Sequence, residues 1–191
     1  MHALFFEMRP HPGHLDHYFD HVARLKPALA RHDGLAFLDR YLSLGNAEVL
    51  LSHQLWESEA AIAAWRADPM HRRSQAAGRH VHFAAYRIRV AERVLRWQSG
   101  MAEPAPAAAA AAADGAHVLA LYGAQAITGP GHSAFESMNH PGRFVTLAAT
   151  DGHDRAAALL AGQIGSTGLE QAAVYAVRRD YGLNDRAQAP Q

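Results

Sequence analysis

Apolar residues in the front half of the chain change their spacing from one segment to the next. Residues 3–9 form a short run rich in phenylalanine that ends at Pro10, which predicts a first strand. From Gly13 onward the apolar residues recur every three or four positions, which predicts one apolar stripe on a helix: Leu15, Tyr18, Phe19, Val22, Leu25 and Leu29. Pro27 should kink this helix near its end, and Asp33-Gly34 should close it.

Two β-rich segments, residues 35–44 and 49–56, follow this helix and are joined by Gly45-Asn46, a link of the hairpin type. A second helical stretch then begins at Ser58, whose side chain can cap it. Its apolar residues Ile62 and Trp65 should face inward.

Asp68-Pro69 should start a further helical turn, with Asp68 as the cap and Pro69 at the first position. Gly78 should end that helix, and residues 80–94 are predicted to form a long last strand. The order β-α-β-β-α-β predicts an α+β fold, a ferredoxin-like sandwich with both helices on one face of an antiparallel sheet.

The back half repeats this pattern in a shortened form. Its predicted strands are residues 118–122, 134–138, 144–149 and 172–181, with one helix at 154–161. The first helix is missing, because residues 128–131 (Thr-Gly-Pro-Gly) cannot carry a helical stripe. The expected organisation is a ferredoxin-like domain at 1–98, an Ala/Pro-rich linker at 99–116, a degenerate second half at 117–183 and a tail at 184–191.

A sheet that is covered by helices on one face leaves its other face apolar and in need of a partner. Two such sheets can pack face to face and form an α+β barrel. The partner is either the back half of the same chain, which gives an internal pseudo-dimer, or a second chain, which gives a homodimer. The sequence leaves both arrangements open.

Composition narrows the possible functions. In 191 residues, 18 Lys and Arg balance 18 Asp and Glu, so no long-range field favours nucleic acid or a membrane surface. The absence of cysteine excludes disulfides, thiolate metal sites and cysteine nucleophiles. No apolar run reaches about 20 residues, and the first residues do not read as a signal peptide, so a cytoplasmic location is expected.

Six segments, spread over roughly residues 3–95, carry a family pattern: Leu25-Lys-Pro27, Gly34 to Tyr41, Leu51 to Ser58, Trp65-Arg66, His71 to Arg79 and Tyr86 to Val90. Together they resemble the antibiotic biosynthesis monooxygenase (ABM) domains of the dimeric α+β barrel group. The resemblance implies the barrel architecture more firmly than a reaction, because the group includes cofactor-independent oxygenases, haem-degrading enzymes and members of unknown role.

Haem-degrading members carry an Asn on the first strand, a Trp on the second helix and a haem-ligating His about ten residues further on. Carried over to this chain, Trp65 matches, but Met8 and Gln75 stand at the other two positions. His71, one helical turn before Gln75, could supply the imidazole only after a shift of register.

The candidate site consists of Trp65 and His71 as catalytic residues and Gln75, Arg79 and Tyr86 as substrate-binding residues. An aromatic wall with an imidazole, an amide and a guanidinium suits a planar phenolic ligand, and His71 could deprotonate the phenol. The resulting phenolate could reduce dioxygen without a metal or other cofactor. In the alternative interpretation, Trp65 is a core residue, and a solvated helix face carries His71, Arg72, Arg73 and Arg79.

Histidines elsewhere in the chain are candidates for metal ligands or for packed strand residues. His14, His17 and His21 fall within one narrow stripe of the first helix and could bind zinc, nickel or copper, although polar surface is the usual role of such residues. His53 should pack against a polar neighbour on its strand, and His80 and His82 should alternate with Val81 along the last strand of the front half.

Two functions of different classes follow from the sequence. The first is a cofactor-independent monooxygenase that acts on a small aromatic or quinol-like molecule. The second is a non-catalytic ligand-binding or assembly module of the same fold. Haem binding is a third possibility, and the back half, which lacks tryptophan, is expected to serve as a structural sheet partner.

Overall fold

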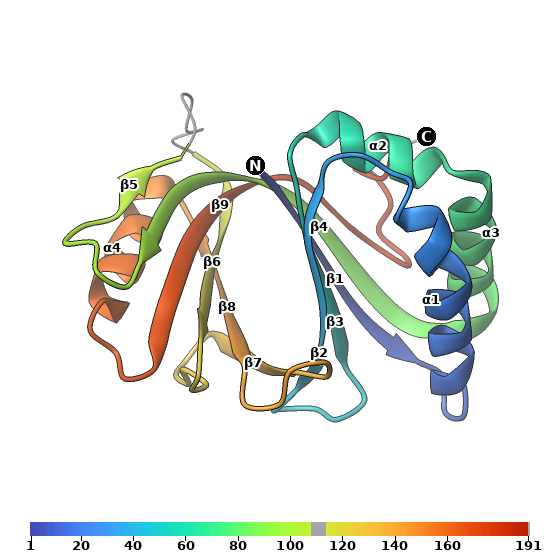
Figure 1. Ribbon diagram of the computed structural model, residues 1–191, viewed down its shortest axis with the longest axis horizontal. Coiled ribbons are helices and arrows are strands. Elements are labelled where there is room, and N and C mark those ends of the chain that lie inside the picture. The colour runs from blue at the N-terminus through green and yellow to red at the C-terminus, as the bar shows by residue number, and fades with distance from the viewer. Residues whose placement is uncertain (108–113, 191) are drawn as a thin grey trace.

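The computed structural model describes residues 1–107 and 114–190 (Figure 1). The front half runs in the predicted β-α-β-β-α-β order, with its second helix in two pieces followed by one π-helical turn. Its elements are β1 (His2–Pro10), α1 (Leu15–Leu29), β2 (Leu35–Ser43), β3 (Leu50–Trp56), α2 (Glu59–Ala67), α3 (Pro69–Ala77), the turn η1 (Gly78–His82) and β4 (Phe83–Gln98).

The predicted start of the last front-half strand is wrong, because His80 and His82 lie in η1 and β4 begins only at Phe83. Gly78 does not end the helix: its backbone is helical, and the helical run continues into η1. Glycine is required there for packing, since a Cβ atom at Gly78 would lie 2.5 Å from the Phe83 ring. Gly78 therefore allows the Phe83 ring to pack closely against the helix, and it does not mark the end of the helix.

The back half confirms the shortened pattern. No helix lies between β6 and β7 in the described residues, and one helix, α4, packs on the outer face of this half. The elements are β5 (Ala105–Pro106), β6 (Ala116–Gly123), β7 (His132–Ser137), β8 (Phe144–Asp151), α4 (His153–Gln163) and β9 (Leu169–Gly182).

The two halves close into one barrel within the chain. In the described residues, nine antiparallel strands follow the order β1-β3-β2-β7-β8-β6-β9-β4-β5, and β4 also pairs with β1. The halves meet at two seams: β4 pairs with β9 from Arg87 to Gln98, and β2 pairs with β7 from Tyr41 to Ser43. Of the two arrangements predicted, the internal pseudo-dimer is therefore the one observed.

The sheet has different cores on its two faces. The barrel interior is filled by residues from both halves, among them Phe5, Leu51, Phe135 and Tyr175, all almost fully buried. Separate apolar clusters lie outside the barrel, under α1 to α3 on one side and under α4 on the other (Figure 1). Trp65 belongs to the cluster under the helices, so its surroundings are between helix and sheet and not between the two sheets.

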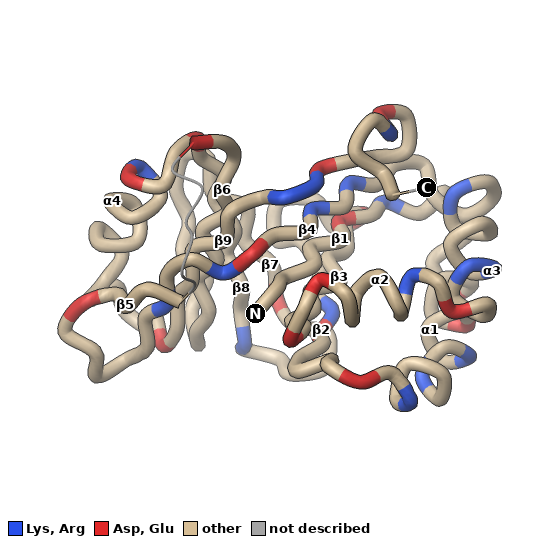
Figure 2. Tube along the Cα trace, turned by 90° about the horizontal axis from the view of Figure 1, so that it is seen from above, with Lys and Arg blue, Asp and Glu red and all other residues tan. Residues whose placement is uncertain are grey.

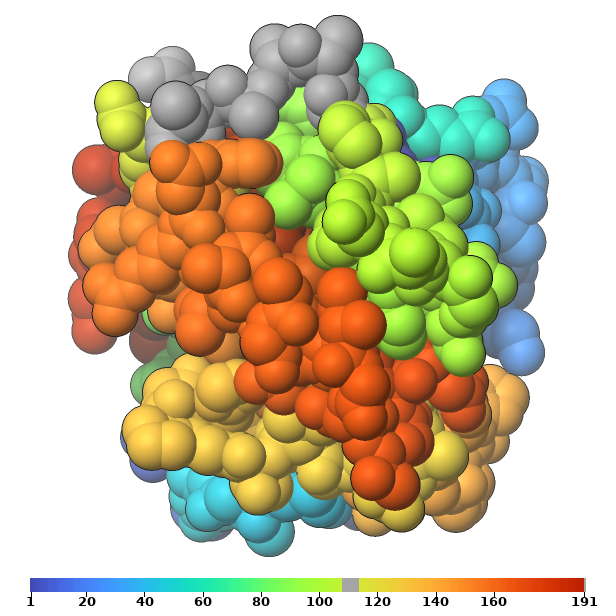
Figure 3. Space-filling model, turned by 90° about the vertical axis from the view of Figure 1, so that its left-hand side faces the viewer, coloured from blue at the N-terminus to red at the C-terminus, as the bar shows by residue number. Residues whose placement is uncertain are grey.

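The segment that follows β4 is attached to the back half. β5 pairs with Leu95 and Arg96 of β4, and Met101 packs against the cluster under α4 while its carbonyl oxygen accepts a 2.9 Å hydrogen bond from Trp97 Nε1. Figure 3 shows this segment in yellow-green beside the orange α4. The alanine run of the predicted linker, at residues 108–113, lies outside the described residues.

Charges of both signs are interspersed along the chain, as Figure 2 shows, in keeping with its balanced composition. None of the helices in the described residues has both the length and the apolar character needed to cross a bilayer.

His53 in the barrel interior should make the fold sensitive to acid. The side chain is fully buried, and burial lowers its pKa from the ordinary 6.5 to about 4. Because the unfolded chain binds this proton more readily, the stabilisation is complete above pH 6.5 and is lost as the pH falls toward 4, by about 3 kcal/mol. Urea unfolding at pH 7 and pH 4.5 should therefore show a smaller loss of unfolding free energy in His53→Gln than in the parent. The exposed His80→Gln is the matched control, and an equal loss in His53→Gln would contradict this assignment.

Candidate functional site

A cavity of about 900 Å³ lies between the helices α1 to α3 and the outer face of the front-half strands. All five residues of the site predicted from sequence line it: Trp65, His71, Gln75, Arg79 and Tyr86. The cavity is within the size range of pockets that hold small molecules.

Local capping places Trp65 and His71 next to each other. Ser58 Oγ accepts from the amide of Ala61 at 3.1 Å and begins α2, whose last full turn carries Trp65. After α2, Asp68 Oδ1 accepts from the amides of Met70 and His71 at 2.8 and 3.0 Å and begins α3. The break between the two helices therefore folds His71 back onto the tryptophan.

The imidazole of His71 stacks on the indole of Trp65, with ring centroids 4.2 Å apart and an angle of 14° between the planes. The edge of Trp65 meets His32 at 5.0 Å, and His32 Nε2 lies 3.3 Å from Asp68 Oδ2. Trp65 is 4% exposed, so most of its indole surface is already in contact with protein. Its main role in this arrangement is to hold the imidazole, and only a small part of the ring reaches the cavity.

Gln75, one helical turn after His71, contacts the imidazole at Nδ1, the ring nitrogen that also faces the Trp65 carbonyl oxygen. Its Nε2 lies 3.0 Å from His71 Nδ1 and donates to the carbonyl oxygen of Arg66 at 3.2 Å. His71 Nδ1 also lies 3.0 Å from the carbonyl oxygen of Trp65. A proton on Nδ1 is donated to that carbonyl and leaves Nε2 as the basic atom, whereas a proton on Nε2 leaves Nδ1 to accept from Gln75.

Burial lowers the pKa of His71 to about 4, and the hydrogen bond with the Trp65 carbonyl only partly offsets this effect. The imidazole is therefore neutral at pH 7. The sequence-based expectation of a base with the ordinary pKa of about 6.5 needs correction, because the residue folds into a desolvated position against Trp65.

Arg79 and Tyr86 lie at different parts of the cavity lining. Arg79 is exposed and lies in the π-helical turn η1 that directly follows α3. Tyr86 lies on β4, and its hydroxyl accepts a 2.8 Å hydrogen bond from Arg186 Nη1 of the C-terminal tail.

The tail of the back half docks onto the front-half cavity. Arg66 donates from Nη1 to the hydroxyl of Tyr181 at 2.9 Å and from Nη2 to the carbonyl oxygen of Pro190 at 2.7 Å. Tyr181, Arg186 and Pro190 all line the cavity. In Figure 1 the C-terminus accordingly lies beside α2. The back half is thus more than a sheet partner, contrary to the structural role expected from its lack of tryptophan.

The cavity lining is strongly cationic. Its described residues include no Asp or Glu, whereas they include one lysine and six arginines: Lys26, Arg40, Arg66, Arg72, Arg79, Arg179 and Arg186. Arg179 forms an ion pair with Glu59 outside the lining. Sequence reasoning missed this feature because the arginines come from separate elements of both halves, and their number is hidden in a net charge of zero. An anionic ligand is favoured in such a site.

The remaining sequence candidates lie elsewhere. Met8 is buried against Tyr18 and Leu50. The predicted histidine stripe does form, and His82 joins it: His14 Nδ1 lies 3.1 Å from His82 Nδ1, and the rings of His17 and His21 lie 5.3 and 5.4 Å from that of His82. Even so, no group of three or more potential ligand residues in the described part of the chain could hold a metal ion.

Comparisons with known proteins agree with this picture of the front half. Residues 1–77 match the family model described as antibiotic biosynthesis monooxygenase. This part of the front half is therefore similar to the ABM family. The resemblance predicted from sequence is confirmed over this part, which includes Trp65, His71 and Gln75 of the candidate site.

A curated relative and several solved structures are similar to the chain. Jasmonate monooxygenase ABM of Pyricularia oryzae is 35% identical over 92 residues, which are 48% of this chain and 43% of the relative. The chain thus spans less than half the length of that protein. An anthrone oxidase-like protein aligns with 100% of this chain and 96% of its own, at 12% identity and a TM-score of 0.43. A candidate monooxygenase of Lactobacillus acidophilus NCFM aligns over 94% of both chains, at 6% identity and a TM-score of 0.46. Such distant likenesses do not bear on the function.

Removing the Arg66 contacts should loosen the tail that docks on the front half. We expect Arg66→Met to raise the amide exchange rates of Leu183 and Ala189 by about fivefold, because the lost hydrogen bond to the Pro190 carbonyl contributes about 1 kcal/mol. Hydrogen exchange read by NMR measures the change, with Arg73→Met, at an exposed arginine of α3, as the matched control. Unchanged rates at both amides would show that Arg66 does not hold the tail.

Proposed function

We propose that the helix-side cavity is the active site of a cofactor-independent monooxygenase that acts on a small aromatic or quinol-like molecule as its anion. The observation that carries the proposal is the cationic lining of a 900 Å³ cavity in the ABM-like front half, next to a neutral, buried imidazole. The name of the relative adds jasmonate, which is also an anion, to the compounds that deserve testing.

The low pKa of His71 decides how a phenolic substrate would lose its proton. A free phenol has a pKa of about 10, so transfer to an imidazole with a pKa of about 4 is uphill by roughly 8 kcal/mol. Cations close to the phenol oxygen favour the phenolate and reduce this cost. The arginines of the lining therefore have to lower the pKa of the substrate, since the protein does not raise the pKa of His71.

Within this proposal the residues of the cavity have different roles. Trp65 and Gln75 hold the His71 ring from its face and from its edge, which fixes the position of the ring. Arg79 at the rim and Arg186 near Tyr86 supply positive charge for the substrate oxygens. Apolar residues of the sheet, among them Leu4, Phe6 and Ile88, provide the surface against which a ring packs.

The reaction balances without a further reductant. For an anthrone-type substrate, loss of a proton gives an electron-rich anion, which transfers electrons to dioxygen and forms a carbon–oxygen bond. Cleavage of the oxygen–oxygen bond then leaves one oxygen as the new carbonyl group and releases the other as water. The substrate methylene supplies all four electrons that reduce dioxygen, so no electron-donating cofactor is required.

The second candidate function is a non-catalytic binding module. It is favoured by the docked tail, since hydrogen bonds from Arg66 and Arg186 hold the segment across the cavity lining. A haem-binding role rests on His71 alone, because Met8 and Gln75 stand where the haem-degrading members have Asn and His. A titration with haem, followed in the Soret band, tests it directly.

Oxygen uptake tests the monooxygenase proposal. Purified protein with anthrone-type compounds or hydroquinones should consume dioxygen, and His71→Gln should lower kcat/KM by about a hundredfold or more because the proton acceptor is lost. Jasmonate is tested for binding alone, because its hydroxylation would require a reductant. For the parent, kcat/KM should hold from pH 7 to about pH 5 and decline as His71 becomes protonated near pH 4.

His11→Gln, at an exposed histidine that lines neither cavity, is the matched control and should leave turnover unchanged. Turnover that His71→Gln does not alter would remove His71 from the mechanism. Saturable binding without any oxygen uptake would instead support the binding module.

A further inference from the structure

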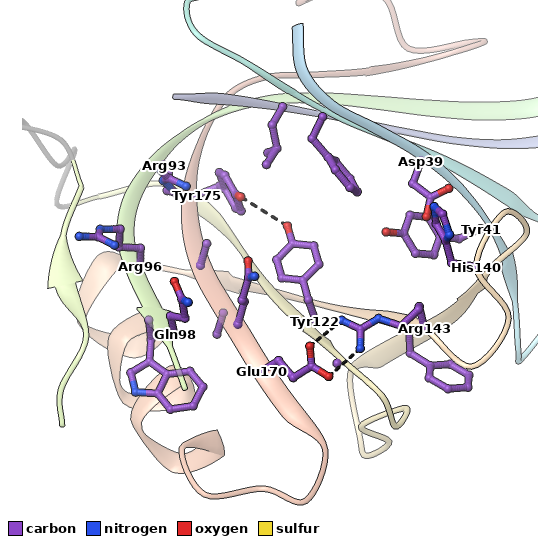
Figure 4. Close-up of a pocket in the computed structure, with 18 residues that line it drawn as sticks. Asp39, Tyr41, Arg93, Arg96, Gln98, Tyr122, His140, Arg143, Glu170 and Tyr175 are labelled. Atoms are coloured by element: carbon purple, nitrogen blue, oxygen red, sulfur yellow. Dashed lines mark hydrogen bonds and ion pairs between the residues drawn. The ribbon is translucent and has the colours of Figure 1, made fainter. Parts of the chain in front are cut away.

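A second cavity, of about 440 Å³, opens at one end of the barrel interior and is lined by residues of both halves (Figure 4). It shares no lining residue with the helix-side cavity. The two cavities lie on opposite faces of the sheet, so a substitution in one need not affect the other.

Two lining residues of this barrel-end pocket, Tyr122 and Tyr175, belong to a chain of hydrogen-bonded groups that continues to the buried His53 behind the lining. Tyr122 lies 2.8 Å from His53 Nε2 and 3.4 Å from the hydroxyl of Tyr175, and His53 Nδ1 lies 3.4 Å from the carbonyl oxygen of Leu4. Burial lowers the pKa of His53 and raises the pKa of both tyrosines, so all three are uncharged at pH 7. The proton on His53 Nδ1 faces the Leu4 carbonyl, and Nε2 accepts from Tyr122.

Of the two β4 arginines in the lining, Arg96 is exposed and Arg93 is partly buried. Arg93 pairs in register with Tyr175, and its positive charge lowers the pKa of both tyrosines in opposition to burial. Its Nε atom is buried without a hydrogen-bond partner, and no ion pair to its guanidinium exists among the residues that the structure describes. A partly buried cation without an anion is costly, so an anionic ligand placed here is stabilising.

The two carboxylates of the lining are already satisfied. Asp39 accepts from Ser137 Oγ at 2.7 Å, from Asn139 Nδ2 at 2.6 Å and from the amide of Arg40 at 2.8 Å. Glu170 forms a two-pronged ion pair with Arg143 at the mouth, with both contacts at 2.6 Å (Figure 4). Neither carboxylate is therefore available to neutralise Arg93.

Apolar side chains make up much of the remaining wall: Phe37, Leu55, Trp97 and Phe144. We propose that the barrel-end pocket is a second binding site, which takes a small organic acid with a flat ring, its carboxylate on Arg93 and its ring against this apolar wall. The site belongs to the fused barrel, because β2, β3 and β4 of the front half and β6, β8 and β9 of the back half each contribute to its lining.

The three tryptophans of the chain allow ligand binding to be measured separately in the two cavities. Trp97 lines the barrel-end pocket, Trp65 lines the helix-side cavity, and Trp56 lines neither. We would titrate ¹⁵N-labelled protein with 2-naphthoate and follow the three indole N–H signals by NMR, with Trp97→Phe to assign the reporter. The uncharged 2-naphthamide is the matched control ligand.

The expected result is a saturable shift of the Trp97 indole with 2-naphthoate and a much weaker response to 2-naphthamide. Arg93→Gln should weaken the titration at Trp97 by about tenfold or more and Arg93→Lys by less, because a charge-assisted hydrogen bond is lost in the first and partly kept in the second. Arg79→Gln, in the helix-side cavity, should leave the Trp97 titration unchanged.

Three outcomes would overturn the proposal: no shift at Trp97 with millimolar 2-naphthoate, an equal response to the amide, or an unchanged titration in Arg93→Gln. Signals of Trp56 and Trp65 that match the parent show that each variant is folded. Since no step depends on oxygen uptake, failure here is separate from failure of the proposed monooxygenase activity.

Discussion

The pairing of β4 with β9 is the constraint on which the rest of the molecule depends. It joins the two halves over most of the length of their last strands, and together with the shorter seam between β2 and β7 it leaves no open edge between them. The apolar inner faces of both sheets are thereby removed from water, which is the dominant favourable contribution to folding. The pairing of β4 with β9 also places β9 against the front half, so that the chain after Gly182 lies beside the helix-side cavity.

Both candidate sites follow from this closure, one on each side of the same sheet. On the outer face, the helices enclose a cavity that is lined mostly by the front half and completed by residues of the back half and its tail. On the inner face, the two halves together form a pocket that neither could form alone. Loss of the first helix from the back half is consistent with this division, because only the front half keeps a complete helix layer and a large cavity beneath it.

Much of the fold could be predicted from the sequence because the local signals agree with the tertiary structure. The apolar run of β1 and the stripe on α1 match the observed elements, and Ser58 and Asp68 cap helices as their residue types predict. The exception is Gly78, where packing against Phe83 overrides the usual meaning of a glycine after a helix.

The site was predictable only in part. The spacing of His71 and Gln75 brought the correct pair together, but the low pKa of His71 arises from tertiary burial against Trp65, which no spacing reveals. The cationic character of the helix-side cavity and the role of Arg93 arise from residues far apart in sequence. Such properties depend on which side chains share a space, and one sequence does not contain that information directly.

The tail that crosses from the back half to the helix-side cavity has a kinetic consequence. In a barrel made from two separate chains, such a segment would lose its contacts with the cavity whenever the subunits dissociated on dilution. Here the covalent connection turns that encounter into an intramolecular one, with an effective local concentration that is set by the geometry of the barrel and is independent of the amount of protein. The cavity therefore keeps its covering segment at any cellular abundance, and opening it requires only local release of a few residues.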